Sequence, residues 1–207
     1  MQFEHNNVRD VYSGISEHFN HTRHYKWKWI EKFLDTLPEK SLVCDIGCGN
    51  GRNMTRESLR FKGVENCPEF IDICTKQGMD VVQADMCSLP FEDNSFDAII
   101  SIASFHHLST PERRALCLKE MLRIMKPGAQ CIVSVWSKVQ PPKTKRKFEN
   151  YGDNMVQWKS KDGEKISDRY YYIFKVDEIQ QFFLDNGFII INYEWDCGNE
   201  VFILEKN

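Results

Sequence analysis

Three acidic side chains recur at intervals of twenty residues in the first half of the chain. Asp45, Glu65 and Asp85 each lie near the end of a short apolar run that is typical of a buried strand. Because the carboxyl ends of parallel strands meet at one edge of a sheet, we expect these three carboxylates to surround one ligand. A carboxylate in such a place can attract an ammonium group, or accept hydrogen bonds from two ribose hydroxyls or from an adenine amino group.

A glycine-rich turn follows the first of these acids. Gly47, Gly49 and Gly51 have the spacing Gly-x-Gly-x-Gly, and glycine lets a backbone turn sharply and approach a ligand. A dinucleotide-binding fingerprint would need Gly-x-Gly-x-x-Gly, but Arg52 occupies its last position. S-adenosylmethionine has no phosphate groups, and its ammonium favours a nearby acid such as Asp45, so we expect it as the cofactor. The residues expected to bind it are Asp45, Gly47, Cys48, Gly49, Asn50, Glu65, Asn66, Asp85, Met86, Ser101 and Ile102, with Met86 packed on the adenine ring.

Strand-like and helical segments alternate around these residues. Strands are predicted at residues 42–46, 61–65, 79–84, 96–103, 130–136, 188–193 and 201–205, and helices at residues 7–37, 51–59, 68–77, 110–125 and 176–186. The alternation predicts a parallel, doubly wound sheet. About seven residues join the last two strands, too few for a crossover helix, so that pair must be antiparallel. The expected fold is therefore an α/β, class I S-adenosylmethionine-dependent methyltransferase, with a Rossmann-like seven-stranded sheet whose last strand is antiparallel.

Length and composition predict one globular domain. The 207 residues are enough for a single domain with a sizeable core, and 42% hydrophobic with 28% charged residues excludes a disordered, collagenous or coiled-coil chain. We expect one methyltransferase domain over residues 1–207, made of a helical extension (1–40), a cofactor-binding core (41–136), a basic substrate-side segment (137–169) and a C-terminal helix with an antiparallel strand pair (170–207).

Cysteine usage and the polar N-terminus indicate the compartment. The eight cysteines include no C-x-x-C pair, which indicates reduced thiols and no metal site. No apolar run is long enough for a membrane span, and the first ten residues are not a secretory signal. We expect a cytoplasmic protein, and the sequence leaves an additional nuclear location open.

The segment between Lys138 and Arg169 is basic although the whole chain has a net charge of −3. It carries nine Lys or Arg against five acids, together with the aromatic residues Phe148, Tyr151 and Trp158. Two interpretations stay open at this point, a solvated linker and a strip that contacts phosphates.

Several segments resemble one family of RNA-modifying enzymes. The resemblance runs through residues 18–24 with Trp27, 43–51, 101–107, 112–114, 135–136, 169–174 and 198–199. Together they are similar to the tRNA wobble-uridine carboxymethyl methyltransferases, that is, the yeast enzyme and the methyltransferase domain of its animal AlkB-type counterpart. The resemblance implies methylation of the carboxylate of wobble 5-carboxymethyluridine to 5-methoxycarbonylmethyluridine. It also implies two partners, the anticodon loop of tRNA and a small zinc-binding activator protein, which we expect to pair with the sheet-edge strand at Met79–Gln83.

The implied methyl transfer depends on the orientation of the substrate carboxylate more than on proton transfer. A carboxylate is ionised at neutral pH, so no general base is demanded, and arginine is suited to holding it in a fixed pose. Arg23 and Arg169 are expected to hold the carboxylate or the adjacent phosphate. His106 is expected to line the pocket, with Tyr170 and Asn199 nearby. For these side chains a purely structural role in capping or packing stays open.

Two other functions compete with this one. A quinone- or sterol-type small-molecule methyltransferase shares the paired histidines, but it would need an apolar lid where this chain is basic. A catalytically silent, cofactor-binding scaffold subunit would also keep Asp45, Glu65 and Asp85. Mass spectrometry of wobble nucleosides separates these alternatives.

Overall fold

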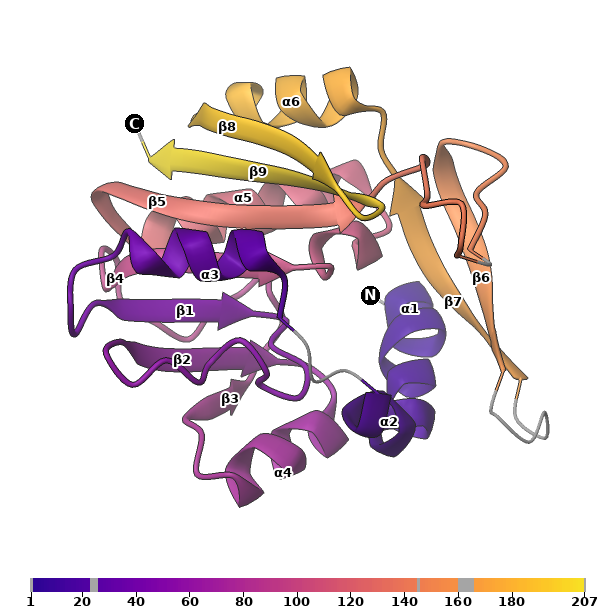
Figure 1. Ribbon diagram of the computed structural model, residues 1–207, viewed down its shortest axis with the longest axis horizontal. Helices are drawn as coiled ribbons and strands as arrows, with labels where there is room; N and C mark the ends of the chain where they lie inside the picture. The colour runs from indigo at the N-terminus through magenta and orange to yellow at the C-terminus, as the bar shows by residue number, and fades with distance from the viewer. Residues whose placement is uncertain (1, 23–25, 145, 160–165, 207) are drawn as a thin grey trace.

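The protein is described by a computed structural model that covers residues 2–22, 26–144, 146–159 and 166–206. Its main sheet contains β1 (Leu42–Ile46), β2 (Arg60–Glu65), β3 (Val81–Gln83), β4 (Phe96–Ile102), β5 (Met125–Trp136), β8 (Phe188–Asp196) and β9 (Asn199–Lys206). The strand order is β3-β2-β1-β4-β5-β9-β8 (Figure 1). The first five strands are parallel, and β9 runs antiparallel to both β5 and β8. The predicted class I fold is therefore confirmed.

Helices cover both faces of this sheet. They are α1 (Gln2–Glu4), α2 (Asp10–Thr22), α3 (Lys28–Asp35), α4 (Pro68–Lys76), α5 (Pro111–Ile124) and α6 (Val176–Asp185), with a π-helical turn η1 (His5–Arg9) between α1 and α2 and a 3₁₀ turn η2 (Phe105–His107) after β4. Both α4 and α5 begin with a proline at the first helical position, where its fixed φ and missing N–H are tolerated. No helix of the described residues is long and apolar enough to cross a bilayer.

The prediction of a helix at residues 51–59 is wrong. This segment forms turns, closed by hydrogen bonds from Met54 N–H to the Gly51 carbonyl (2.9 Å) and from Leu59 N–H to the Arg56 carbonyl (3.1 Å). Gly51 has φ +72°, a left-handed conformation that an α-helix cannot contain. A side chain at this position would also collide with Met79, since an added Cβ would lie 2.2 Å from its sulfur.

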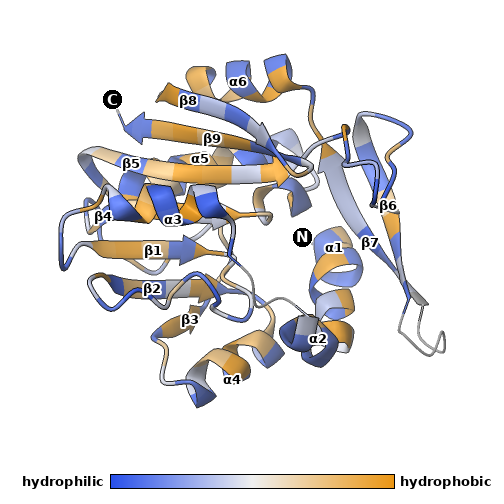
Figure 2. Cartoon of the chain, viewed as in Figure 1, coloured by the Kyte–Doolittle hydropathy of each residue, from blue (hydrophilic) through white to orange (hydrophobic). Residues whose placement is uncertain are grey.

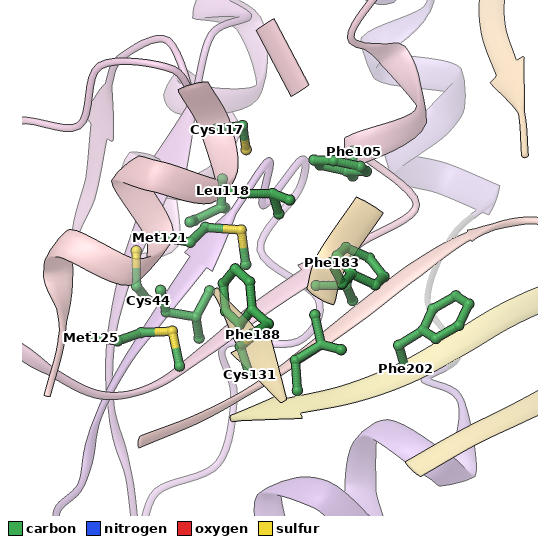
Figure 3. Close-up of a cluster of buried hydrophobic side chains, with 14 of the residues drawn as sticks. Cys44, Phe105, Cys117, Leu118, Met121, Met125, Cys131, Phe183, Phe188 and Phe202 are labelled. Carbon is green, nitrogen blue, oxygen red and sulfur yellow. The ribbon is translucent and has the colours of Figure 1, made fainter. Parts of the chain in front are cut away.

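Two apolar layers position the strands. On one face the sheet packs against α5 and α6, and Figure 3 shows part of this layer, with Met121, Phe183 and Phe202 among its buried side chains. On the other face α3 buries Ile30 and Leu34 against β1, β4 and β5. Central parallel strands are buried on both faces and are therefore mostly apolar, and Figure 2 shows this as the orange colour of much of β1 and β5.

The second half of the expected basic segment is a β-hairpin, which the sequence analysis missed. Strands β6 (Gly152–Lys159) and β7 (Ile166–Ile173) pair antiparallel in a sheet of their own and lie beside α1 and α2 in Figure 1. β6 alternates half-buried and exposed residues, a period of two that is typical of a strand. β7 also runs across the expected boundary between residues 169 and 170, so neither a plain linker nor that boundary describes this part of the chain.

Candidate cofactor and substrate site

A cavity of about 620 Å³ lies at the carboxyl ends of β1, β2 and β4. Side chains of η1, α2 and β7 form its opposite wall. The expected site residues that line it are Gly47, Cys48, Gly49, Asn50, Glu65, Asn66, Asp85, Met86, Ile102, Arg169 and Asn199. Four others, Asp45, Ser101, His106 and Tyr170, do not line it, and Arg23 lies outside the described residues.

Asp45 is a buried carboxyl group beside the glycine turn. It is 1% exposed, and neither of its oxygens accepts a hydrogen bond within the described residues. Burial raises the pKa of Asp45 to about 7, and Glu65 raises it further, whereas Arg52 and the nearby Asn53 side chain lower it. A buried carboxyl group that accepts no well-formed hydrogen bond fits a cationic ligand group, and the ammonium of S-adenosylmethionine is such a group.

The glycine turn is held against the loop after β4. Gly47 has φ +75°, and a Cβ there would lie 2.5 Å from Cβ of Ser104. The Ser104 hydroxyl donates to the Ile46 carbonyl (2.9 Å) and exchanges a hydrogen bond with the Ser101 hydroxyl (2.9 Å). Ser101 therefore supports the turn from behind instead of lining the cavity.

Glu65 accepts three backbone hydrogen bonds at the end of β2. Its carboxylate accepts from the N–H groups of Gly49 (2.8 Å), Asn66 (2.8 Å) and Cys67 (2.9 Å). Burial raises the pKa of Glu65 although these N–H groups lower it. Because Glu65 also lines the cavity, its carboxylate suits the ribose hydroxyls of the expected cofactor.

Asp85 already has a cationic partner that the sequence analysis missed. Nη2 of Arg113 donates to both carboxylate oxygens of Asp85, at 2.9 and 2.8 Å, and Nε of Arg113 donates to Glu4 at 2.6 Å. The pKa of Asp85 is lowered because the Cys87 N–H and Arg113 outweigh the effect of burial. If Asp85 accepts a hydrogen bond from the adenine amino group as predicted, it would use carboxylate lone pairs that are not occupied by Arg113.

Of the paired histidines, His107 lines the cavity, not His106. Nδ1 of His107 lies 2.8 Å from the Tyr170 carbonyl, which can only accept, so Nδ1 carries the proton and Nε2 accepts from the Tyr12 hydroxyl (3.1 Å). The Tyr12 oxygen also lies 3.1 Å from the Tyr171 hydroxyl. Burial lowers the pKa of His107 to about 3, so this histidine is a neutral hydrogen-bond acceptor.

His106 and Tyr170 pack behind this wall. His106 is fully buried, and its Nδ1 accepts from the Trp136 N–H (3.0 Å). Burial lowers its pKa well below the ordinary range. The Tyr170 hydroxyl donates to Asp153 (2.6 Å). In the structure both residues shape the site from outside the cavity.

Arg169 brings a positive charge to the part of the cavity lined by Tyr12 and Trp136, which we call the substrate end. It is 8% exposed, and its guanidinium lies 5.6, 5.5 and 6.0 Å from the rings of Tyr12, Tyr171 and Trp136. Its Nε is buried and donates no hydrogen bond within the described residues. Asn199 lines the same cavity and donates to the Asp196 carbonyl (3.1 Å). A buried cation with an unpartnered N–H group fits an anionic substrate.

Sequence reasoning missed several further lining residues, namely Tyr12, Phe19, Trp27, Arg52, Ser104, His107, Arg113, Trp136 and Arg146. The seven-residue spacing of Tyr12 and Phe19 places them on one helix face, which was a usable signal. Arg146 belongs to the basic segment for which the sequence left both a solvated linker and a phosphate-contacting strip open, and no local pattern predicts that Arg146 lines the cavity.

The comparisons with known proteins agree with this geometry. A family model described as a methyltransferase domain matches residues 44–133. A putative methyltransferase of Encephalitozoon cuniculi is 32% identical over 99% of this chain and 97% of its own length. A mouse tRNA (carboxymethyluridine(34)-5-O)-methyltransferase is 37% identical over 70% of this chain, and an Arabidopsis thaliana protein of that name is 40% identical over 64%. The chain spans only 22% and 33% of those last two relatives.

Solved structures share the fold at low sequence identity. A Methanosarcina mazei S-adenosylmethionine-dependent methyltransferase has a TM-score of 0.68 and 21% identity, over 84% of this chain and 96% of that one. A putative methyltransferase in complex with the Haloferax volcanii Trm112 methyltransferase activator has a TM-score of 0.66 and 18% identity, over 96% and 97%.

Proposed function

The chain belongs to the class I S-adenosylmethionine-dependent methyltransferases, and on this premise we propose its substrate. The proposed reaction methylates the carboxylate of 5-carboxymethyluridine at the wobble position of tRNA to 5-methoxycarbonylmethyluridine. Relatives named for this reaction are 37% and 40% identical to the chain. The observation that carries the proposal is the buried, unpartnered Nε of Arg169 at the substrate end of the cavity.

Asp45, Glu65 and the glycine turn would hold the cofactor. When bound, S-adenosylmethionine supplies a methyl group on a positively charged sulfur, and its transfer to a carboxylate oxygen yields an ester and S-adenosylhomocysteine without any proton transfer. Arg169 would orient the carboxylate, and orientation of this kind can lower an activation barrier by roughly 7–11 kcal/mol. With its pKa lowered to about 3, His107 is a weak base, which is compatible with a reaction in which no base is needed.

Nucleoside mass spectrometry tests this function. Cells that lack the protein are expected to lose 5-methoxycarbonylmethyluridine from their tRNA and to accumulate the free acid, and the purified chain should restore the ester in vitro. Unchanged wobble nucleosides together with a methylated quinone or sterol would support a small-molecule enzyme instead. Loss of the ester in cells, restored equally by a variant without cofactor binding, would indicate a scaffold subunit.

We further propose that a small zinc-binding activator docks at the β3 edge of the sheet. β3 is an outermost strand of only three residues, and an outermost strand has backbone groups available for pairing with another chain. The strand is shorter than the edge predicted at Met79–Gln83, and Val81 and Val82 are half-buried, so only part of their apolar surface is exposed. The Haloferax volcanii complex described above supports a partner of this kind.

A further inference from the structure

Arg146 reaches the cavity from a segment that the sequence assigned to the surface. Its guanidinium carbon lies 3.7 Å from the centre of the Trp136 ring. The Tyr171 ring stacks on Trp136 as well, with centroids 4.1 Å apart and planes inclined by 11°. One face of an indole cannot hold both groups at these distances, so Trp136 is sandwiched between Arg146 and Tyr171.

Two guanidinium groups therefore lie around one ring. Arg169 is 6.0 Å from the centre of Trp136, and both arginines line the cavity. Their charges act on the same neighbour, because the pKa of His106 is lowered first by burial and then by positive groups that include Arg146 and Arg169.

The described acids that line the cavity are Glu4, Glu65 and Asp85, and each of them already accepts hydrogen bonds. Glu65 accepts backbone N–H groups, while Glu4 and Asp85 accept from Arg113. Beside Trp136 the described lining carries the guanidinium groups of Arg146 and Arg169, and Nη1 of Arg146 also donates to Oε1 of Gln140 at 3.3 Å. Two cations beside one ring favour the binding of an anionic group.

A carboxylate can accept hydrogen bonds from both guanidinium groups. Its two oxygens offer about four lone-pair positions, so it can accept from two arginines and still direct one lone pair toward a methyl group. A guanidinium stacked on a ring keeps its N–H groups in a plane parallel to that ring, which fixes their direction. An amide of the same shape would present N–H donors to these donors and would bind less well.

We infer that Arg146 is a specificity-determining residue, which with Arg169 selects an anionic substrate group over an uncharged group of the same shape. The inference rests on the proposed function for its first candidate anion, the wobble carboxylate. The phosphate of the wobble nucleotide is the second source of the same chemistry.

The test uses the full chain bound to S-adenosylhomocysteine and two anticodon stem-loop RNAs. These RNAs differ only in carrying 5-carboxymethyluridine or its uncharged carbamoylmethyl analogue at the wobble position. Dissociation constants are measured for the wild type, Arg146→Gln, Arg146→Lys and the matched control Lys143→Ala, an exposed residue of the same segment. Unchanged affinity for S-adenosylhomocysteine verifies that each variant is folded.

The wild type is expected to prefer the carboxymethyl RNA at least tenfold. Arg146→Gln should reduce this preference at least fivefold, Arg146→Lys should retain part of it, and Lys143→Ala should weaken both RNAs by one factor. If Arg146→Gln weakens both RNAs equally and makes their binding less salt-dependent, the anion is the phosphate. Unchanged affinities of Arg146→Gln for both RNAs would overturn the inference.

Failure of the proposed function gives a different result. A wild type that methylates neither RNA and binds both equally contradicts the proposed function, and acetate and inorganic phosphate then serve as probes of the anion site. Tighter binding of either anion by the wild type than by Arg146→Gln supports the inference alone, and equal binding overturns it.

Discussion

Asp45 and Glu65 are both buried carboxyl groups, yet they differ in their hydrogen-bond partners. Glu65 accepts three backbone N–H groups, whereas Asp45 accepts none within the described residues. Burial raises the pKa of both, and that of Asp45 reaches about 7. A bound ammonium would favour the ionised form of Asp45, so cofactor binding should be linked to the loss of its proton.

Cofactor affinity is therefore expected to depend on pH through Asp45. Below the pKa the ligand must displace a proton, so affinity should fall by up to about tenfold per pH unit as the pH decreases from roughly 7 to 5.5. Asp45→Asn should flatten this profile and weaken S-adenosylhomocysteine binding at pH 7.5 by about tenfold or more. Calorimetry over this pH range checks both effects. A wild-type affinity that does not vary with pH would contradict the role assigned to Asp45.

The same substitution should stabilise the ligand-free chain. The pKa of Asp45 is about 7 in the folded chain and near 4 in the unfolded chain. Ionisation of this carboxyl group therefore destabilises the fold progressively as the pH rises from about 4 to about 7. Asp45→Asn removes this effect, so its Tm should exceed that of the wild type by several degrees or more near pH 8 and by little near pH 4, since about 1 kcal/mol shifts Tm by roughly 2–4 °C at this length. A Tm difference that is equal at both pH values would count against burial as the cause.

At the scale of elements, the N-terminal segment is fastened to the cofactor end by one carboxylate. Glu4 accepts from the Ser109 N–H (2.7 Å), the Ser109 hydroxyl (2.9 Å) and Nε of Arg113, and Arg113 in turn binds Asp85. The side chains of Glu4 and Arg113 are only 12% and 15% exposed. Screening by water is therefore weak at this ion pair.

Glu4→Gln is expected to loosen α1 and α2 without unfolding the chain. Loss of a hydrogen-bonded charge should cost about 1–3 kcal/mol, seen as faster amide exchange in these helices and severalfold weaker S-adenosylhomocysteine binding. Glu17→Gln, an exposed change on α2, is the control and should alter neither. Equal exchange rates in the wild type and Glu4→Gln would show that the segment is held by its other contacts.

Of the basic residues before the hairpin that could contact phosphates, only some are exposed. Lys143 and Lys147 are exposed, Lys145 lies outside the described residues, and Arg146 lines the cavity. Neutralising Lys143 and Lys147 together should make log K against log salt shallower by about 1.4–1.8, because each phosphate contact contributes about 0.7–0.9. Lys119→Ala on α5 is the control, and an unchanged slope in the double variant would remove these lysines from the RNA interface.

Local patterns predicted the main sheet but not the convergence of distant segments. The alternation of strands and helices, with a short last connection, was enough to predict seven strands and an antiparallel last pair, because each strand must bury its own apolar residues. The choice between His106 and His107 was not local, since it depends on Tyr12, 95 residues away. The pairing of Arg113 with Glu4 across 109 residues is of the same kind. Such contacts are set by the tertiary arrangement, and a single sequence carries no trace of them.

At the scale of the whole molecule, the sheet has two outer strands of different character. β3 is short and half-buried at one edge, while β8 at the other edge exposes Ile189, Ile191, Tyr193 and Trp195. An apolar exposed edge can also bind another chain. β8 is therefore an alternative docking site for the proposed activator. β3, however, lies directly beside the cofactor residue Glu65, because Gln83 of β3 pairs with Glu65 of β2.

A partner at β3 should therefore be coupled to the cofactor site. Ordering β3 steadies Glu65 through their shared register, so the activator should tighten S-adenosylmethionine binding, and the cofactor should tighten activator binding by the same factor, as linkage requires. The measurement is a calorimetric cycle on the chain with and without co-expressed activator, for the wild type, Val82→Asp on β3 and Ile191→Asp on β8. Val82→Asp should abolish the partner and its effect on the cofactor while leaving the partner-free cofactor affinity unchanged, and Ile191→Asp should alter neither. The opposite pattern would move the partner to β8, and full solubility with full methyl transfer by the isolated chain would show that no activator is needed.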